Sequence, residues 1–282
     1  MKKAQWITAV TGLIAVVLIY AFGPTVPKHK DVQPVTQMAG MQQQAVSTDT
    51  ILYYAKMQVK PEQVIWLNTL ENSISRGDVR DQKLKVLHQL AHFWSDSASI
   101  FEPYAWYEAE ASRLENSEKS LTFAARLFLD NLQNDDDGSR RKWKALQAKD
   151  LFERSLTINP DNDSAKIGLG ACYLFGNISA TPMEGILKIR EVAAKDSTNS
   201  YAQIMLAKGS LISGQYDKAI PRLETVARLE PENAEAVLML ADINERLGNK
   251  AVAVSWYEKS LRLVKQPEAL AEIRKRIEAL KK

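Results

Sequence analysis

The sequence contains one cysteine and three histidines in 282 residues. A lone Cys172 excludes an intramolecular disulfide and a CxxC pair, so we expect it to be a small packing residue. Only His88 and His92 stand at metal-ligand spacing, and residue 89 is glutamine where a zinc hydrolase of the HExxH type needs glutamate as its general base. The third histidine, His29, lies far away in the sequence. The sequence therefore predicts no metal site, no cofactor and no enzyme.

Glycine and proline are also scarce, with 12 and 10 residues, and no phosphate-binding loop, dinucleotide fingerprint or GxSxG motif is present. Ala, Leu, Glu, Lys and Arg dominate after residue 47, which favours a helical globular body. The net charge of +3 is spread over stretches of both signs. Nucleic-acid binding usually needs a concentrated basic face, so we expect no nucleic-acid partner.

A run of three aspartates, Asp135 to Asp137, precedes a basic stretch that ends at Lys144. A calcium loop with Gly138 as its turn glycine would need a carboxylate at residue 144, where this chain has lysine. We therefore expect the aspartates to form a solvated loop and the basic residues to begin a helix, with Trp143 packed inward. Binding of the basic residues to an anionic surface is the alternative.

Residues 4–22 form the one long uncharged apolar run, and as a helix they would reach about 28 Å, close to the thickness of a bilayer core. We expect a single-pass anchor over residues 1–22 that contacts the lipid bilayer through residues 4–22. A cleaved signal peptide is the alternative, although Pro24 would follow the cut directly. Lys2 and Lys3 favour a cytoplasmic N-terminus, which places the body in the periplasm of a bacterium, at the inner membrane. Residues 23–46, rich in Pro and Gln, are expected to be a flexible, disordered tether.

Residues 200–233 align with residues 234–267 without a gap, at an offset of 34 residues. This period is typical of paired helices stacked in an array. Small residues recur at matching positions of the expected helices, namely Ala148, Gly170, Ala207, Ala219, Ala241 and Ala253. A glycine inside a helix costs about 1 kcal/mol relative to alanine, so Gly170 indicates a neighbouring helix that passes too close for a side chain.

On these residues the chain resembles the tetratricopeptide repeat family over residues 84–267. The five units are 84–117, 118–162, 163–199, 200–233 and 234–267, preceded by a helical cap or degenerate repeat over 47–83 and followed by a capping helix over 268–282. Together with the anchor, the chain looks like single-pass bacterial members that assist membrane-protein biogenesis, cytochrome maturation or envelope assembly. The resemblance implies an all-α solenoid, a right-handed superhelix of helix pairs, whose concave face binds proteins or peptides.

If the family's geometry holds, the first helix of each pair lines this concave groove. The expected groove residues are Lys85, His88, His92, Lys119, Arg126, Ile167, Ala171, Leu174, Phe175, Tyr201, Ile204, Lys208, Leu211, Glu235, Leu238 and Asp242. Its first units are polar and mainly basic, and its middle units are apolar. Some of the apolar residues could instead be covered by the chain itself.

The sequence thus predicts a non-catalytic, membrane-tethered scaffold that binds a protein or peptide segment. The alternative is an architectural protein that self-associates as a homo-oligomer or bridges envelope layers, with no ligand in the groove.

Overall fold

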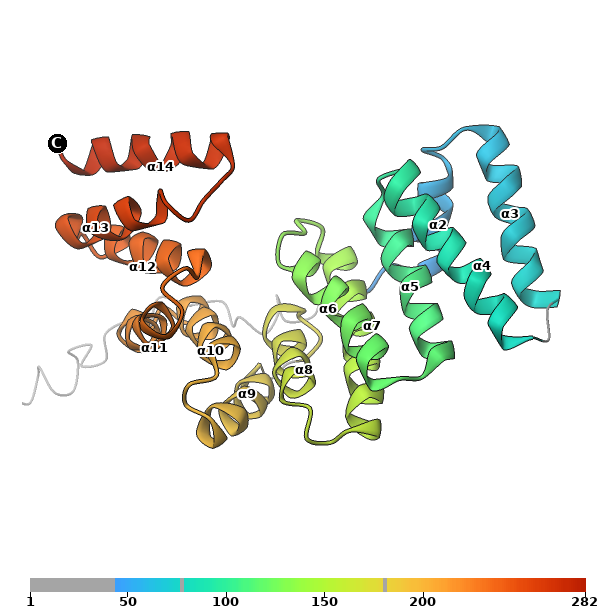
Figure 1. The fold of residues 1–282 in the computed structure, drawn as a ribbon, viewed down its shortest axis with the longest axis horizontal. Helices are drawn as coiled ribbons and strands as arrows, with labels where there is room; N and C mark the ends of the chain where they lie inside the picture. The colour runs from blue at the N-terminus through green and yellow to red at the C-terminus, as the bar shows by residue number, and fades with distance from the viewer. Residues whose placement is uncertain (1–43, 77–78, 180–181) are drawn as a thin grey trace, which may run out of the picture. The chain divides into compact units, whose positions relative to one another are not determined.

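The computed structural model describes residues 44–76, 79–179 and 182–282, and in these ranges every regular element is a helix (Figure 1). The expected anchor and residues 23–43 of the expected tether lie outside this part of the chain. Within it, no helix combines the length and the apolar character that a membrane crossing requires.

Five consecutive helix pairs make up most of the body. They are α4 (Arg80–His92) with α5 (Phe101–Glu115), α6 (Glu118–Leu132) with α7 (Gly138–Ile158), α8 (Asp163–Phe175) with α9 (Met183–Lys195), α10 (Ser200–Ile212) with α11 (Tyr216–Leu229), and α12 (Ala234–Arg246) with α13 (Lys250–Ser260). Each pair also packs against the next, α5 on α6, α7 on α8, α9 on α10 and α11 on α12. The predicted all-α solenoid is therefore confirmed for the described residues.

Helices outside these pairs cover both ends of the array. They are α2 (Thr48–Lys56) and α3 (Pro61–Arg76) before the first pair, and α14 (Pro267–Leu280) after the last. Helix α2 packs on α5, α3 on α4, and α14 on α13. Ala45 and Val46, at the end of the expected tether, already pack against the hydrophobic core. The packed body therefore begins within the range that the sequence assigned to the tether.

The small residues predicted to face neighbouring helices do so. Ala148, Ala219 and Ala253 are fully buried. A Cβ atom on Gly170 would lie 2.6 Å from the carbonyl oxygen of Gly185 and 2.7 Å from Cγ1 of Ile189, both on α9. The prediction of a close helix approach at Gly170 is therefore confirmed, and α8 and α9 meet almost backbone to backbone.

The first helices of the last three pairs begin in the same way, on an asparagine. The Oδ1 atoms of Asn162, Asn199 and Asn233 accept hydrogen bonds of 2.9 to 3.0 Å from the backbone N–H of the residue three positions later. An asparagine cap satisfies one of the backbone N–H groups that a helix leaves unpaired at its start. These caps fix where α8, α10 and α12 begin, and therefore which side chains they turn toward one another.

Candidate protein-binding groove

A depression of about 610 Å³ lies across the first helices of three successive pairs, α8, α10 and α12, with two contributions from the chain between α6 and α7 and from α7 itself. Its lining residues are Gln133, Arg141, Leu174, Phe175, Lys208, Leu211, Ile212, Glu235 and Met239. Five of these, Leu174, Phe175, Lys208, Leu211 and Glu235, belong to the set predicted from the sequence. The structure therefore brings the centre of the predicted concave face together, and we call this set of nine residues the groove.

The apolar surface of the groove comes from long side chains that the core leaves partly uncovered. Ile212, at the end of α10, is 64% exposed, whereas Leu174, Phe175, Leu211 and Met239 are half-buried. Exposed apolar surface of this kind gains free energy when a partner covers it, about 25 cal/mol for each Å² removed from water. The groove is thus suited to bind apolar side chains.

The ammonium group of Lys208 has two partners in the groove. Its Nζ atom lies 2.6 Å from Oε1 of Glu235 on α12 and donates a hydrogen bond of 3.1 Å to Oε1 of Gln133, after α6. Its side chain is 21% exposed. Because the carboxylate of Glu235 neutralises the charge of Lys208, this lysine contributes to the shape of the groove more than to its net charge.

A second contact joins α6 to α10 next to the groove. The guanidinium carbon of Arg126 lies 5.3 Å from the centre of the Tyr201 ring, a distance at which a cation and an aromatic face attract each other. Helices α6 and α10 both also pack on α8. Side chains from α6 and α10 therefore meet across α8.

Three residues that were expected to line the groove are buried instead. Ile167 and Ala171 on α8 are fully buried, and Ile204 on α10 is 5% exposed. Helix α8 packs against α6, α7, α9 and α10, and these helices together cover its inner side chains. These three residues form core beneath the groove and are not available to contact a ligand.

Burial also alters two ionisable groups near this contact. Burial raises the pKa of the Tyr201 hydroxyl, which has no hydrogen-bond partner among the described residues. Burial raises the pKa of Asp130 as well, and the nearby charges of Arg126 and Lys208 only partly oppose that effect. Burial therefore disfavours the charged form of both groups.

The C-terminal helix closes the far end of the predicted face. The Nη1 atom of Arg276 on α14 lies 2.8 Å from Oδ1 of Asp242, and Leu238 packs in a cluster with Ile273 and Ile277 of α14. Asp242 and Leu238 were expected to line the groove. They hold the cap instead, so the groove ends near Glu235 and Met239.

The basic residues expected at the near end do not line the groove. His88 Nδ1 lies 3.4 Å from Oε1 of Glu108 on α5, and His92, whose side chain is 72% exposed, borders a separate depression between α3 and α4. Lys85 lines a third depression between the same two helices. Lys119 is exposed on α6. Lys85, His88 and His92 are therefore exposed on α4 but lie outside the groove.

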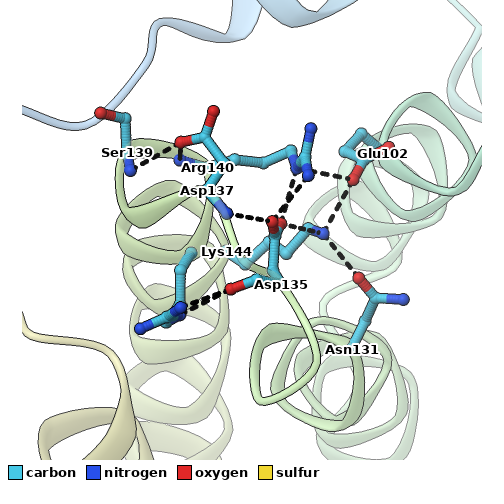
Figure 2. A network of polar contacts seen from close by, with 8 residues as sticks. Glu102, Asn131, Asp135, Asp137, Ser139, Arg140 and Lys144 are labelled. Carbon is cyan, nitrogen blue, oxygen red and sulfur yellow. Dashed lines mark hydrogen bonds and ion pairs between the residues drawn. The ribbon is translucent and has the colours of Figure 1, made fainter.

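Asp136 and Asp137 are exposed, as expected for a solvated loop, whereas Asp135 is buried and departs from that expectation. The side chains of Asp135 and Lys144 are each 2% exposed, and Lys144 Nζ lies 2.6 Å from Oδ2 of Asp135, 2.7 Å from Oε1 of Glu102 and 2.6 Å from Oδ1 of Asn131 (Figure 2). Arg140 adds a bidentate pair of hydrogen bonds, of 2.6 and 2.7 Å, to the two carboxylate oxygens of Asp135. Figure 2 shows Asp135 between these two cations. All three ammonium hydrogens of Lys144 therefore have an oxygen acceptor.

This buried ion network, defined as Glu102, Asn131, Asp135, Arg140 and Lys144, strongly favours the ionised carboxylate. Burial alone would raise the pKa of Asp135, but hydrogen bonds from Arg140 and Lys144 outweigh it and lower the pKa to about 2. Lys144 is buried, and Arg140, whose side chain is 43% exposed, is paired with Asp135. The alternative that the basic run binds an anionic surface therefore loses two of its cations.

The network also orients one side chain of the groove. Arg141 donates hydrogen bonds of 2.8 Å from Nε and 2.6 Å from Nη2 to the backbone carbonyl oxygen of Asp135. The same aspartate is thus held through its carboxylate by Arg140 and Lys144 and through its carbonyl by Arg141. Arg141 and Gln133 could not be assigned to the groove from the repeat pattern, because that pattern assigns groove positions only within first helices.

Comparison with known proteins gives one family match. No curated protein matches the chain. Among solved structures, PilW, a widely conserved type IV pilus biogenesis factor, is 17% identical, with a TM-score of 0.47, over 70% of this chain and 88% of that one. MamA from Desulfovibrio magneticus RS-1 is 20% identical, with a TM-score of 0.42, over 66% and 96% of the two chains. YrrB, described as a TPR protein with an unusual peptide-binding site, is 14% identical, with a TM-score of 0.41, over 73% and 97%.

The family match covers α11, α12 and α13 and most of α10, which supply Lys208, Leu211 and Glu235 to the groove. These helices lie within the last two units that the offset of 34 residues defined. Residues 204–266 are identified by this match as tetratricopeptide repeat sequence.

Proposed function

We propose that this protein is a non-catalytic scaffold that binds a segment of a partner protein in the groove. The observation that carries the proposal is the partly uncovered apolar surface of Leu174, Phe175, Leu211, Ile212 and Met239, gathered in one depression. Apolar side chains of a partner that fill such a depression supply most of the binding energy in interfaces of this kind. The match of residues 204–266 to tetratricopeptide repeats supports the same role.

The chemistry near the groove supports binding rather than catalysis. Cys172 is fully buried, and burial raises the pKa of its thiol, so the thiolate nucleophile is disfavoured. Burial likewise raises the pKa of the Tyr201 hydroxyl. Among the described groove residues, no nucleophile lies beside a general base.

We further propose that residues 4–22 anchor the protein in the inner membrane and that the groove faces the periplasm. The uncharged apolar run and the two lysines before it support this arrangement. Protease added to spheroplasts should digest the body, and alkaline carbonate should leave the protein in the membrane pellet. A body protected from protease, or one released by carbonate, would contradict the arrangement.

Site-specific photo-crosslinking tests the binding proposal. A photoreactive phenylalanine analogue in place of Ile212, in the groove, should crosslink a distinct protein in intact cells. The same analogue in place of Val252, an exposed position on α13 outside the groove, serves as the matched control. The captured partner, once purified, should bind the full chain in detergent.

Substitutions separate groove binding from the architectural alternative. Phe175→Glu places a charge in the groove and should abolish the Ile212 crosslink and binding of the purified partner, whereas Val252→Glu should change neither. Equal effects of the two substitutions would contradict binding in the groove. Crosslinks only between copies of this chain would favour the architectural protein.

A further inference from the structure

Of the two cationic side chains that line the groove, one has a carboxylate partner and the other has only a carbonyl oxygen. Lys208 has the carboxylate of Glu235 at 2.6 Å. Arg141 has only the neutral carbonyl oxygen of Asp135 as its acceptor, and no carboxylate lies within ion-pair distance of it among the described residues. The groove therefore keeps one uncompensated positive charge, on Arg141.

The guanidinium of Arg141 is also held in place. Two of its five N–H groups donate to the Asp135 carbonyl, which leaves three for a ligand. The loop that carries this carbonyl is fixed in turn by hydrogen bonds from Arg140 and Lys144 to the Asp135 carboxylate. A preorganised guanidinium loses less conformational entropy on binding than a free one, and its planar donors match a carboxylate.

The apolar neighbours of Arg141 in the groove strengthen its attraction for a negatively charged ligand. Leu174, Phe175 and Met239 line the same depression and are half-buried. When a ligand covers apolar surface beside a charge, water is excluded and the attraction to an opposite charge becomes stronger. The ligand that satisfies both features has a bulky apolar side chain and a carboxylate next to each other.

We propose that Arg141 is the specificity determinant of the groove and selects partner segments in which an aspartate or glutamate stands beside a bulky apolar residue. This inference rests on the proposed function, because it names the chemistry of the segment that the groove binds. Arg141 contacts the ligand carboxylate, and Asp135 with Lys144 acts on the ligand only by positioning Arg141.

Selection from a random library of 12-residue peptides displayed on phage tests the inference. The full chain, immobilised in detergent micelles, should enrich peptides that carry Leu, Ile or Phe within two positions of Asp or Glu. Arg141→Gln should keep the apolar enrichment and lose the acidic one. Arg154→Gln is the matched control, because Arg154 lies on the same helix, pairs with Asp150 and does not line the groove.

Reversing the charge at residue 141 distinguishes loss of the positive charge from unfolding of the chain. Arg141→Glu should enrich peptides with Lys or Arg beside the apolar residue, a gain that an unfolded chain cannot produce. For the best acidic peptide, replacing its carboxylate with an amide should weaken binding to the native chain by about tenfold and to Arg141→Gln hardly at all.

The possible outcomes distinguish the inference from the proposed function. If the native chain enriches no peptide, and the peptides recovered with Phe175→Glu do not differ from those recovered with the native chain, both the inference and the proposed function are overturned. Apolar enrichment without acidic preference, or acidic preference that survives Arg141→Gln, would overturn the role of Arg141 while the groove remains a binding site.

Discussion

Two regions of the body, α2 to α7 and α8 to α13, are stabilised by different kinds of contact. The first region contains buried charge and large aromatic side chains, such as Trp143 against Phe128, whose ring centres are 5.4 Å apart. The second region contains small residues at helix crossings, asparagine caps at helix starts and left-handed glycine turns at Gly214 and Gly248. The tetratricopeptide match lies entirely in the second region.

The difference shows why one region follows a repeat and the other does not. A contact between small residues at a helix crossing needs only the right residue at the right position, so it can recur at each period. The buried ion network needs Glu102 from α5, Asn131 from α6 and Lys144 from α7 at the same time. Such a cluster does not recur from one repeat unit to the next.

The groove draws on both regions. Its apolar wall comes from α8, α10 and α12, whereas Arg141 and Gln133 come from the first region. The repeat therefore supplies a surface that other proteins of this architecture could share, and the irregular region supplies the charge that would distinguish one ligand from another. Function on a shared scaffold resides in such local departures from the pattern.

The largest expected effect in the first region comes from Lys144→Met. Methionine has a similar length but cannot pair, so Asp135 and Glu102 lose their shared cation in the interior. Removing one partner of a buried ion pair typically lowers the free energy of unfolding by about 3 to 5 kcal/mol, and the remaining Arg140 favours the lower figure. Urea denaturation followed by circular dichroism measures the change. Lys142→Met, one residue from Trp143, is the matched control, and an equal loss in both variants would contradict a specific role for Lys144.

In the second region, Gly170→Leu should produce the next largest effect. Even a Cβ atom at this position would lie 2.6 Å from the Gly185 carbonyl oxygen, so a leucine must force α8 and α9 apart. Overpacking of this kind costs about 1 to 3 kcal/mol. Thermal melting of the variant should fall well below that of Gly214→Ala, whose glycine has open space around it but a left-handed backbone. An unchanged melting temperature would mean that the two helices are not in close contact.

Much of the second region could be predicted from the sequence because its contacts are local and periodic. Gly170 and Ala219 were assigned to helix crossings from spacing alone, and both lie there. Leu174, Phe175 and Leu211 were expected in the groove from the geometry that the resemblance to tetratricopeptide repeats implies, and all three line it.

The remaining features could not be predicted because they depend on contacts between distant helices. In the sequence, Asp135 lies in a run of charged residues, and such runs are usually solvated. The residues next to it do not show that Glu102 and Lys144 surround it in the fold. Ile167 and Ala171 stand at groove positions, but their burial depends on how closely α6 and α10 approach each other across α8. Asp242 likewise stands at a groove position, and Arg276 of the C-terminal helix forms an ion pair with it.

Acid should weaken the first region more than the second. The pKa of Asp135 is about 2, below its ordinary value of 3.8, so the unfolded chain takes up a proton more readily than the folded one. Stability from this group is therefore full above about pH 5 and is lost as the pH falls through 4 toward 2, by on the order of 2 kcal/mol in total. The comparison with Asp135→Asn isolates the effect, because the variant cannot titrate there. A stability difference between the two proteins that stays constant from pH 5 to pH 3 would contradict the low pKa.

The smallest effects concern two helix starts, those of α10 in the second region and α4 in the first, and they should have opposite signs. Asn199→Ala removes the acceptor of the Ala202 N–H and should lower the free energy of unfolding by about 1 kcal/mol, whereas Asn199→Asp keeps an acceptor and should change it little. Helix α4 begins after Val79, which is 52% exposed, has an extended backbone and makes no side-chain cap. Val79→Asn should therefore raise the free energy of unfolding by several tenths of a kcal/mol. Denaturant titrations of both variants give the two signs, and a loss at Val79 would show that packing rather than capping determines the start of α4.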